Sequence, residues 1–127
     1  MINFSPALKI YLHREPIDMR KSYDGLFGIV KNELAMDIRG GGLFMFINLR
    51  RNRVKLMYWD RDGIAIWQKR LERGSWQHPQ PKDSAKHLEI DAADLNLLLA
   101  GIDLASVKRR LRYVSPDTSN TNASQLV

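Results

Sequence analysis

The stretch LFMFINLRRNRVKLMYWDRDGIAIWQKRLERG, residues 43–74, decides the fold. Residues 43–47 are continuously apolar and short, which predicts a strand buried on both faces. Residues 53–59 and 64–71 flank Asp60-Arg61-Asp62-Gly63. Asp-Gly is a strong tight-turn signal because both residues tolerate a positive φ. The stretch therefore predicts a buried strand followed by a β-hairpin.

Two further segments before this stretch have recognisable patterns. Residues 8–12 alternate apolar and polar side chains before Pro16, which predicts a short edge strand. Apolar side chains then recur at helical spacing from Met19 to Leu34, and Asp18 is a natural N-cap for a helix that begins at Met19. The triple glycine at 40–42 ends this region.

The residue pattern in the C-terminal third of the domain predicts a second helix. Residues 87–90 can add a short strand, and Asp91 caps a helix over residues 91–100 with Gly101 at its exit. We expect an α+β fold, a small antiparallel β-meander of about four strands with two helices packed on one face. The helices start at Met19 and Ala92.

One domain is expected over residues 1–112, followed by a disordered polar tail at 113–127, because the tail has too little apolar surface to bury. Whether Lys108–Arg112 is helical or a basic arm stays open. The chain lacks an apolar run of about 20 residues and a secretion signal, so a membrane span is not expected and the cytoplasm is the expected location. The absence of cysteine excludes disulfides, thiolate zinc sites and a cysteine nucleophile.

The positive charge of the chain is local. The net charge is +6, and residues 40–74 hold eight basic and three acidic residues, whereas residues 104–114 hold four basic residues and no acidic one. Clustered cations of this kind are typical of a surface that binds a polyanion such as nucleic acid. The alternative is that the charge only keeps the protein dispersed.

Side chains alternate across a strand, so the hairpin divides into two faces. The apolar face should meet the helices and consists of Val54, Leu56, Tyr58, Ala65, Trp67, Lys69 and Leu71. The opposite face mixes apolar and basic groups and consists of Arg53, Lys55, Met57, Trp59, Ile64, Ile66, Gln68 and Arg70. We expect this second face to bind DNA, with cations on phosphates and Trp59 stacking on a base. The expected phosphate contacts are Arg50, Arg51, Arg53, Lys55 and Arg70.

Two other groups of charged residues have competing interpretations. Arg20 and Lys21, in the first turn of the predicted helix, form either an anion site or a solvated pair. Asp60 and Asp62 are candidate metal ligands of a nuclease, but aspartate is common beside turns and no third carboxylate has a recognisable spacing to them. No catalytic residues, metal or cofactor are therefore expected.

Three blocks of the sequence together resemble a known family. These blocks are DMRKSYDGL at 18–26, LFMFINLRRNRVKLMYWDRDGIAIWQKRLERGSW at 43–76 and LNLLLAGID at 95–103. In order and spacing they resemble TnpB, the small accessory protein encoded beside the DDE transposase in bacterial insertion sequences of family sixty-six. The resemblance covers about residues 5–104 and implies a role in transposition beside a separate transposase. It carries over no catalytic residues.

The sequence thus predicts a non-catalytic accessory factor that binds the DNA ends of its element through the basic hairpin face. The alternative is a protein-binding module without direct DNA contact. In that case Met57, Trp59, Ile64 and Ile66 dock onto the transposase or onto a second copy of the chain.

Overall fold

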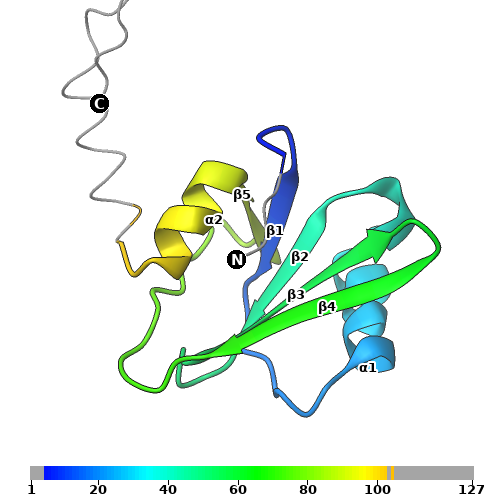
Figure 1. Ribbon diagram of the computed structural model, residues 1–127. Coiled ribbons are helices and arrows are strands. Elements are labelled where there is room, and N and C mark those ends of the chain that lie inside the picture. The colour runs from blue at the N-terminus through cyan, green and yellow to red at the C-terminus, as the bar shows by residue number, and fades with distance from the viewer. Residues whose placement is uncertain (1–4, 103, 105–127) are drawn as a thin grey trace, which may run out of the picture.

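The computed structural model, which describes residues 5–102 and 104, contains a five-stranded sheet in the order β4-β3-β2-β1-β5 (Figure 1). The strands are β1 (Lys9–His13), β2 (Leu43–Ile47), β3 (Arg53–Asp60), β4 (Gly63–Arg70) and β5 (His87–Asp91). The helices are α1 (Tyr23–Gly28), which continues into the π-helical turn η1 (Ile29–Glu33), and α2 (Ala92–Leu99); a 3₁₀ turn, η2, spans Ile38–Gly40. The predicted α+β class is confirmed, with five strands.

The position of β1 differs from the prediction. It lies inside the sheet, parallel to β2 and antiparallel to β5, so the prediction of an N-terminal edge strand in an antiparallel meander is wrong. Only β2, β3 and β4 form a meander. The chain between β1 and β2 carries α1 and η1, and such a helical crossover returns the chain parallel to the strand it left. The predicted strand at 87–90 is confirmed as β5, which takes the edge.

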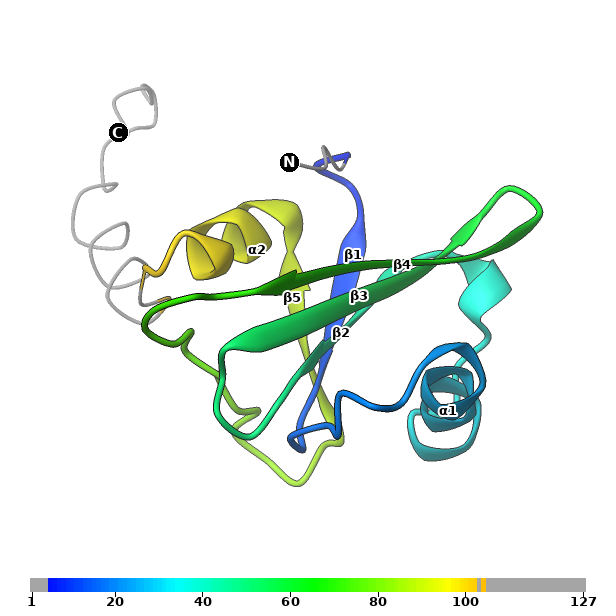
Figure 2. The same ribbon diagram turned by 60° about the horizontal axis from the view of Figure 1, so that its bottom comes forward.

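The two helices cover opposite faces of the sheet, so the prediction that both pack on one face is wrong (Figure 2). Leu43, Met45 and Ile47 of β2 belong to the hydrophobic cluster that includes α2. Phe44 and Phe46 point the other way, into the cluster that includes α1 and η1. All five residues of β2 are buried, and a strand buried on both faces needs a layer on each side of the sheet.

The starts of the helices confirm one of two predicted caps. At α2, the Asp91 side chain accepts from the Asp94 amide, and the Asp94 side chain accepts from the Asp91 amide, which forms a capping box. Gly101 follows the end of the helix with φ 88°. Helix α1 begins at Tyr23 rather than Met19, and its N-cap residue Ser22 makes no side-chain capping bond. The prediction that Asp18 caps this helix is wrong.

The hairpin and its two faces are confirmed. Asp60 pairs with Gly63, so Arg61 and Asp62 form the loop, and the positive φ falls on Arg61 at 59° rather than on the Asp-Gly pair. The apolar face packs in the α2 cluster. Met57, Trp59, Ile64 and Ile66 pack in the α1 cluster. The segment Lys108–Arg112 and the tail at 113–127 lie outside the described residues.

Trp76 joins the segment after β4 to α2. Its side chain is 2% exposed, and its indole N–H donates to the Leu99 carbonyl at 3.1 Å, which is one of the carbonyls left without a partner in the last turn of the helix. No role for Trp76 was predicted from the sequence, because the segment around it is rich in turn residues.

Replacing Trp76 with Phe should lower the free energy of unfolding by about 2–4 kcal/mol, since it leaves a cavity and removes the donor to Leu99. Urea denaturation measures the change. Trp67→Phe is the matched control, because Trp67 is only partly buried on the same face of the sheet. Equal losses for the two variants would contradict a special role for the Trp76 bond.

Candidate nucleic-acid interface

The loop between β2 and β3 forms a β-turn at one end of the sheet. The Arg51 amide donates to the Asn48 carbonyl at 3.0 Å, which places Leu49 and Arg50 at the two central positions. The side-chain oxygen of Asn48 accepts from the amides of Asn52 and Arg53 at 3.0 and 2.9 Å. Asparagine is favoured at the first position of such turns because its side chain bonds the backbone that follows.

Four of the predicted phosphate contacts gather around this turn. We call Arg50, Arg51, Arg53 and Arg70 the arginine corner; all four are exposed. Arg53 and Arg70 are direct cross-strand partners in β3 and β4, although like charges placed opposite each other destabilise a sheet. Arg70 is paired with an acidic residue, since its Nε lies 3.0 Å from Oε2 of Glu72. Within the described residues, no carboxylate forms an ion pair with Arg50, Arg51 or Arg53.

The arginine corner borders a shallow concavity of about 420 Å³. It is lined by Ile17, Asp18 and Met19 from the segment before α1, by Asn48, Leu49 and Asn52 from the turn, and by Arg50, Arg53 and Arg70. Guanidinium groups are planar forks that bind phosphate oxygens in pairs, so this arrangement suits a phosphate backbone.

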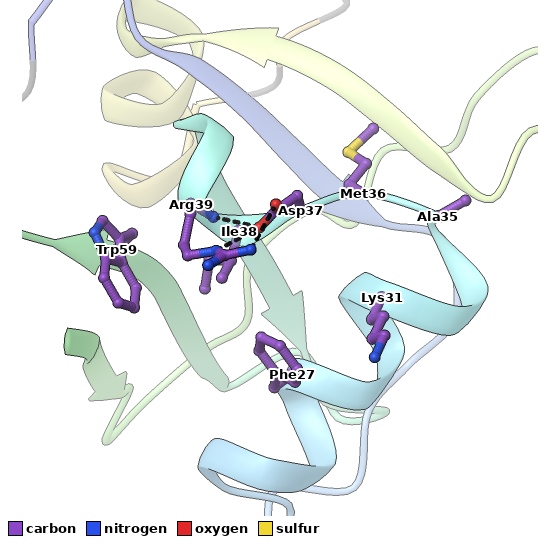
Figure 3. A pocket seen from close by; sticks show the side chains of 8 residues that line it. All are labelled: Phe27, Lys31, Ala35, Met36, Asp37, Ile38, Arg39 and Trp59. Carbon is purple, nitrogen blue, oxygen red and sulfur yellow. Dashed lines mark hydrogen bonds and ion pairs between the residues drawn. The ribbon is translucent and has the colours of Figure 1, made fainter. Parts of the chain in front are cut away.

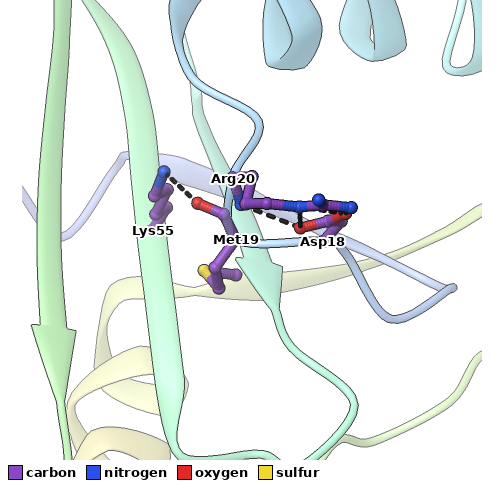
Figure 4. Close-up of polar contacts among 4 residues, drawn as sticks. All are labelled: Asp18, Met19, Arg20 and Lys55. Carbon is purple, nitrogen blue, oxygen red and sulfur yellow. Dashed lines mark hydrogen bonds and ion pairs between the residues drawn. The ribbon is translucent and has the colours of Figure 1, made fainter.

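Lys55, in contrast, is part of the structure beneath the arginine corner. The residue is 8% exposed, and its ammonium donates to the Met19 carbonyl at 2.9 Å (Figure 4). It also donates to the Lys21 carbonyl at 2.7 Å. Burial lowers the pKa of Lys55 below its usual value, and the charge of Arg53 lowers it further. Its charge therefore fixes the chain segment before α1 against β3.

Arg20 and Lys21 precede α1, so the prediction that they lie in the first turn of a helix is wrong. The Arg20 guanidinium bonds to the Asp18 carboxylate at 2.6 Å, and this bond lowers the pKa of Asp18 to about 2 (Figure 4). Lys21 is exposed. Arg20 is thus neutralised by its neighbour, whereas the unpaired arginines of the corner are not.

Trp59 lies toward the other end of β3 from Arg53. The rise per residue in a β-strand puts the two residues about 20 Å apart along the strand. It lines a cleft of about 700 Å³, which we call the Trp59 cleft. Figure 3 shows Trp59 and Phe27 flanking the cleft, with the paired Asp37 and Arg39 and the side chain of Ile38 between them. Lys31, Ala35 and Met36 complete the lining. The structure thus separates Trp59 from the arginines with which the sequence grouped it.

The residues that the sequence missed are Leu49, Asn48, Phe27 and Arg39. The NLRRN segment carried a signal, since asparagine favours a turn and the leucine that follows it stands before two arginines. The proximity of Phe27 to Trp59 could not be predicted from the sequence, because the two residues lie in elements that are far apart in the chain.

Asp60 is the last residue of β3 and Asp62 lies in the hairpin turn, and both are exposed. Over residues 5–102 and 104, no three metal-binding side chains of histidine, cysteine, aspartate or glutamate gather within reach of one ion. None of the helices in the same described ranges has the length and apolar character that crossing a membrane requires.

A five-stranded sheet with a helix layer on each face defines a small α+β protein, and its charged corner is a candidate binding surface. The family model described as "IS66 Orf2 like protein" matches residues 8–109, and the chain belongs to this family. Membership associates the chain with transposition of IS66-type insertion sequences as an accessory, Orf2-like protein.

Two relatives from Sinorhizobium fredii strain NGR234 extend over most of the chain. "Uncharacterized protein y4jC" is 36% identical over 110 residues, which is 87% of this chain and 92% of the relative. "Uncharacterized protein y4hO" is 29% identical over 103 residues, 81% of this chain and 88% of the relative. No solved structure matches the chain significantly.

Replacing Lys55 with Met should lower the free energy of unfolding by about 1–3 kcal/mol, because the Met19 and Lys21 carbonyls lose their donor. Urea denaturation measures the loss. Lys69→Met is the control, since Lys69 is an exposed lysine on the neighbouring strand and should change stability little. Unchanged stability together with weaker DNA binding would instead make Lys55 a phosphate contact.

Proposed function

We propose that this chain is a non-catalytic accessory protein of transposition that binds the DNA ends of its element through the arginine corner. The observation that carries the proposal is that Arg50, Arg51 and Arg53 are exposed at one end of the sheet and form no ion pair with a carboxylate of the described residues. A phosphate backbone is bound by such cations through charge and through release of condensed counterions. Family membership supports the DNA of an insertion sequence as the polyanion.

The cross-strand pair of Arg53 and Arg70 supports the same function. Two like charges opposite each other in a sheet lower stability, and only Arg70 has an acidic neighbour to offset this. Arg51 adds a second local cost, because a residue other than glycine with φ 59° is strained. An anionic ligand would relieve the repulsion, so the corner is better suited to the bound state than to the free protein.

The proposal predicts a steep salt dependence of binding to a labelled element-end duplex. If all four arginines contact phosphates, the logarithm of the binding constant should fall against the logarithm of salt concentration with a slope of about −3 to −4. Two arginines with the same φ of 59° provide a matched pair of variants, because Arg51 lies in the corner and Arg61 lies at the opposite end of β3. Arg51→Gly should make the slope less steep by about one, and Arg61→Gly should leave it unchanged.

Stability serves as the internal control for this pair. Glycine at a positive φ removes a backbone penalty of about 1–2 kcal/mol from the folded state. Part of this gain is lost because glycine also raises the conformational entropy of the unfolded chain. Both variants should therefore unfold at a higher temperature than the parent. Weaker binding by Arg51→Gly alone would then follow from the position of the lost charge. If both variants weaken DNA binding equally, the effect comes from the net charge of the protein and not from the arginine corner. Absence of DNA binding at low salt would contradict the proposal.

The Trp59 cleft supports a second candidate function, docking onto the transposase of the same element. Half-buried aromatic side chains in a concave apolar surface are typical anchors of protein interfaces. Met57 of the predicted docking patch is fully buried, whereas Trp59, Ile64 and Ile66 are half-buried, so Trp59 and the cleft that it lines are the candidate contact for a partner.

The docking candidate predicts that Trp59→Ala abolishes co-purification with the transposase, whereas Arg51→Gly preserves it. Lys31→Glu, an exposed change at the cleft, should weaken the complex if Trp59→Ala proves unstable. Circular dichroism of each variant checks folding. Loss of the complex in Arg51→Gly but not in the two cleft variants would place the partner at the arginine corner instead.

A further inference from the structure

Leu49 is an unusually exposed apolar side chain at the tip of the β2–β3 turn. It is 80% exposed, compared with 49% for Tyr23 and 41% for Ile102, the other large exposed hydrophobic residues of the described chain. Its neighbours Arg50 and Arg51 are exposed and have no carboxylate partner there. Solvent exposure of a leucine beside two arginines has no stabilising role in the free fold.

The turn that carries Leu49 is held in one conformation from within. Asn48 bonds its own turn through three contacts: its side-chain oxygen accepts from the amides of Asn52 and Arg53, and its side-chain amide donates to the Asn52 side chain at 2.8 Å. The Arg51 amide closes the turn on the Asn48 carbonyl. The tip is therefore preorganised rather than flexible.

The turn is also fastened to the body of the protein from below. The Arg51 carbonyl accepts from the amide of the buried Trp76 at 2.8 Å, and the Asn52 carbonyl accepts from the Leu71 amide at 2.7 Å. These contacts occupy the inward-facing backbone groups and leave Leu49 and Arg50 pointing outward. These hydrogen bonds would keep the turn in place when a partner contacts its tip.

We propose that Leu49 is a wedge that enters the minor groove of duplex DNA and opens a base step, while the flanking arginines bind the phosphates. This inference rests on the proposed function and deepens it, because it assigns the mode of DNA contact. Proteins that bend DNA insert single apolar side chains between base steps and place cations on the adjacent backbone. The product is a kinked duplex.

Charge and size favour duplex DNA over other occupants. The minor groove is about 6 Å wide, which admits one side chain at a turn tip but not a helix or a ribbon. Arg50 and Arg51, which follow Leu49 in the turn, and Arg53 at the start of β3 supply cations next to the leucine, and a duplex offers phosphates along both borders of the groove. An anionic membrane surface would also attract arginines, but stable attachment needs a larger apolar face than one leucine supplies.

The test measures binding and bending separately. An element-end duplex of about 30 base pairs carries a donor and an acceptor dye at its ends, so bending raises energy transfer between them. Wild-type protein at saturation should raise energy transfer. Leu49→Ala should abolish most of this rise, keep the salt slope and weaken binding by about tenfold or less, because the phosphate contacts remain.

Two further variants sharpen the result. Ile102→Ala, which removes another exposed apolar side chain, should bend the duplex as the parent does. Leu49→Met, which keeps an apolar side chain of similar volume, should retain bending. A duplex with a central mismatch should bind more tightly than the matched duplex, since the step is already partly unstacked, and Leu49→Ala should lose this preference.

The outcomes distinguish failure of the wedge from failure of DNA binding. Salt-dependent binding without bending, or equal bending by Leu49→Ala, would overturn the wedge and leave the proposed function standing. No binding to any duplex at low salt would remove both. Sedimentation with vesicles of anionic phospholipid that depends on Leu49, without duplex bending, would overturn the wedge in favour of a membrane contact.

Discussion

The complete burial of β2 is the constraint on which the rest of the structure depends. A strand with every side chain buried needs a neighbour strand on each edge and a layer on each face. The neighbours are β1 and β3, and the layers are α2 on one face and α1 with η1 on the other. Both ends of β3 are exposed, at Arg53 and at Asp60, whereas its middle from Val54 to Met57 is buried, and charged groups remain accessible at those ends.

Much of this fold follows from the sequence where the signal is local. The hairpin, its two faces, the capped helix α2 and the double-sided burial of 43–47 all rest on periodicity or turn chemistry within a few residues. Double-sided burial also implies helices on opposite faces, so the prediction of both on one face contradicted it. The parallel pairing of β1 with β2 and the late start of α1 depend on contacts between distant segments, which no local pattern contains.

The candidate site divides along the same line. Arg53 and Lys55 lie on one face of β3 and are two residues apart, yet Arg53 is exposed and Lys55 is buried. The difference comes from the carbonyls of Met19 and Lys21, which reach Lys55 through the fold and not through the sequence. Alternation along a strand predicts which face a side chain occupies, but only the cover above that face decides whether its charge meets solvent.

The arrangement of the two accessible surfaces has a consequence for the proposed function. The arginine corner and the Trp59 cleft lie at opposite ends of β3, about 20 Å apart at the rise of a strand. The strand between them is packed from Val54 to Met57 and has no hinge, so the separation is fixed. A duplex at the corner would leave the cleft open to a protein. The two proposed functions, DNA binding and transposase docking, are therefore compatible in one complex, in which a DNA end would lie at a set distance from the partner.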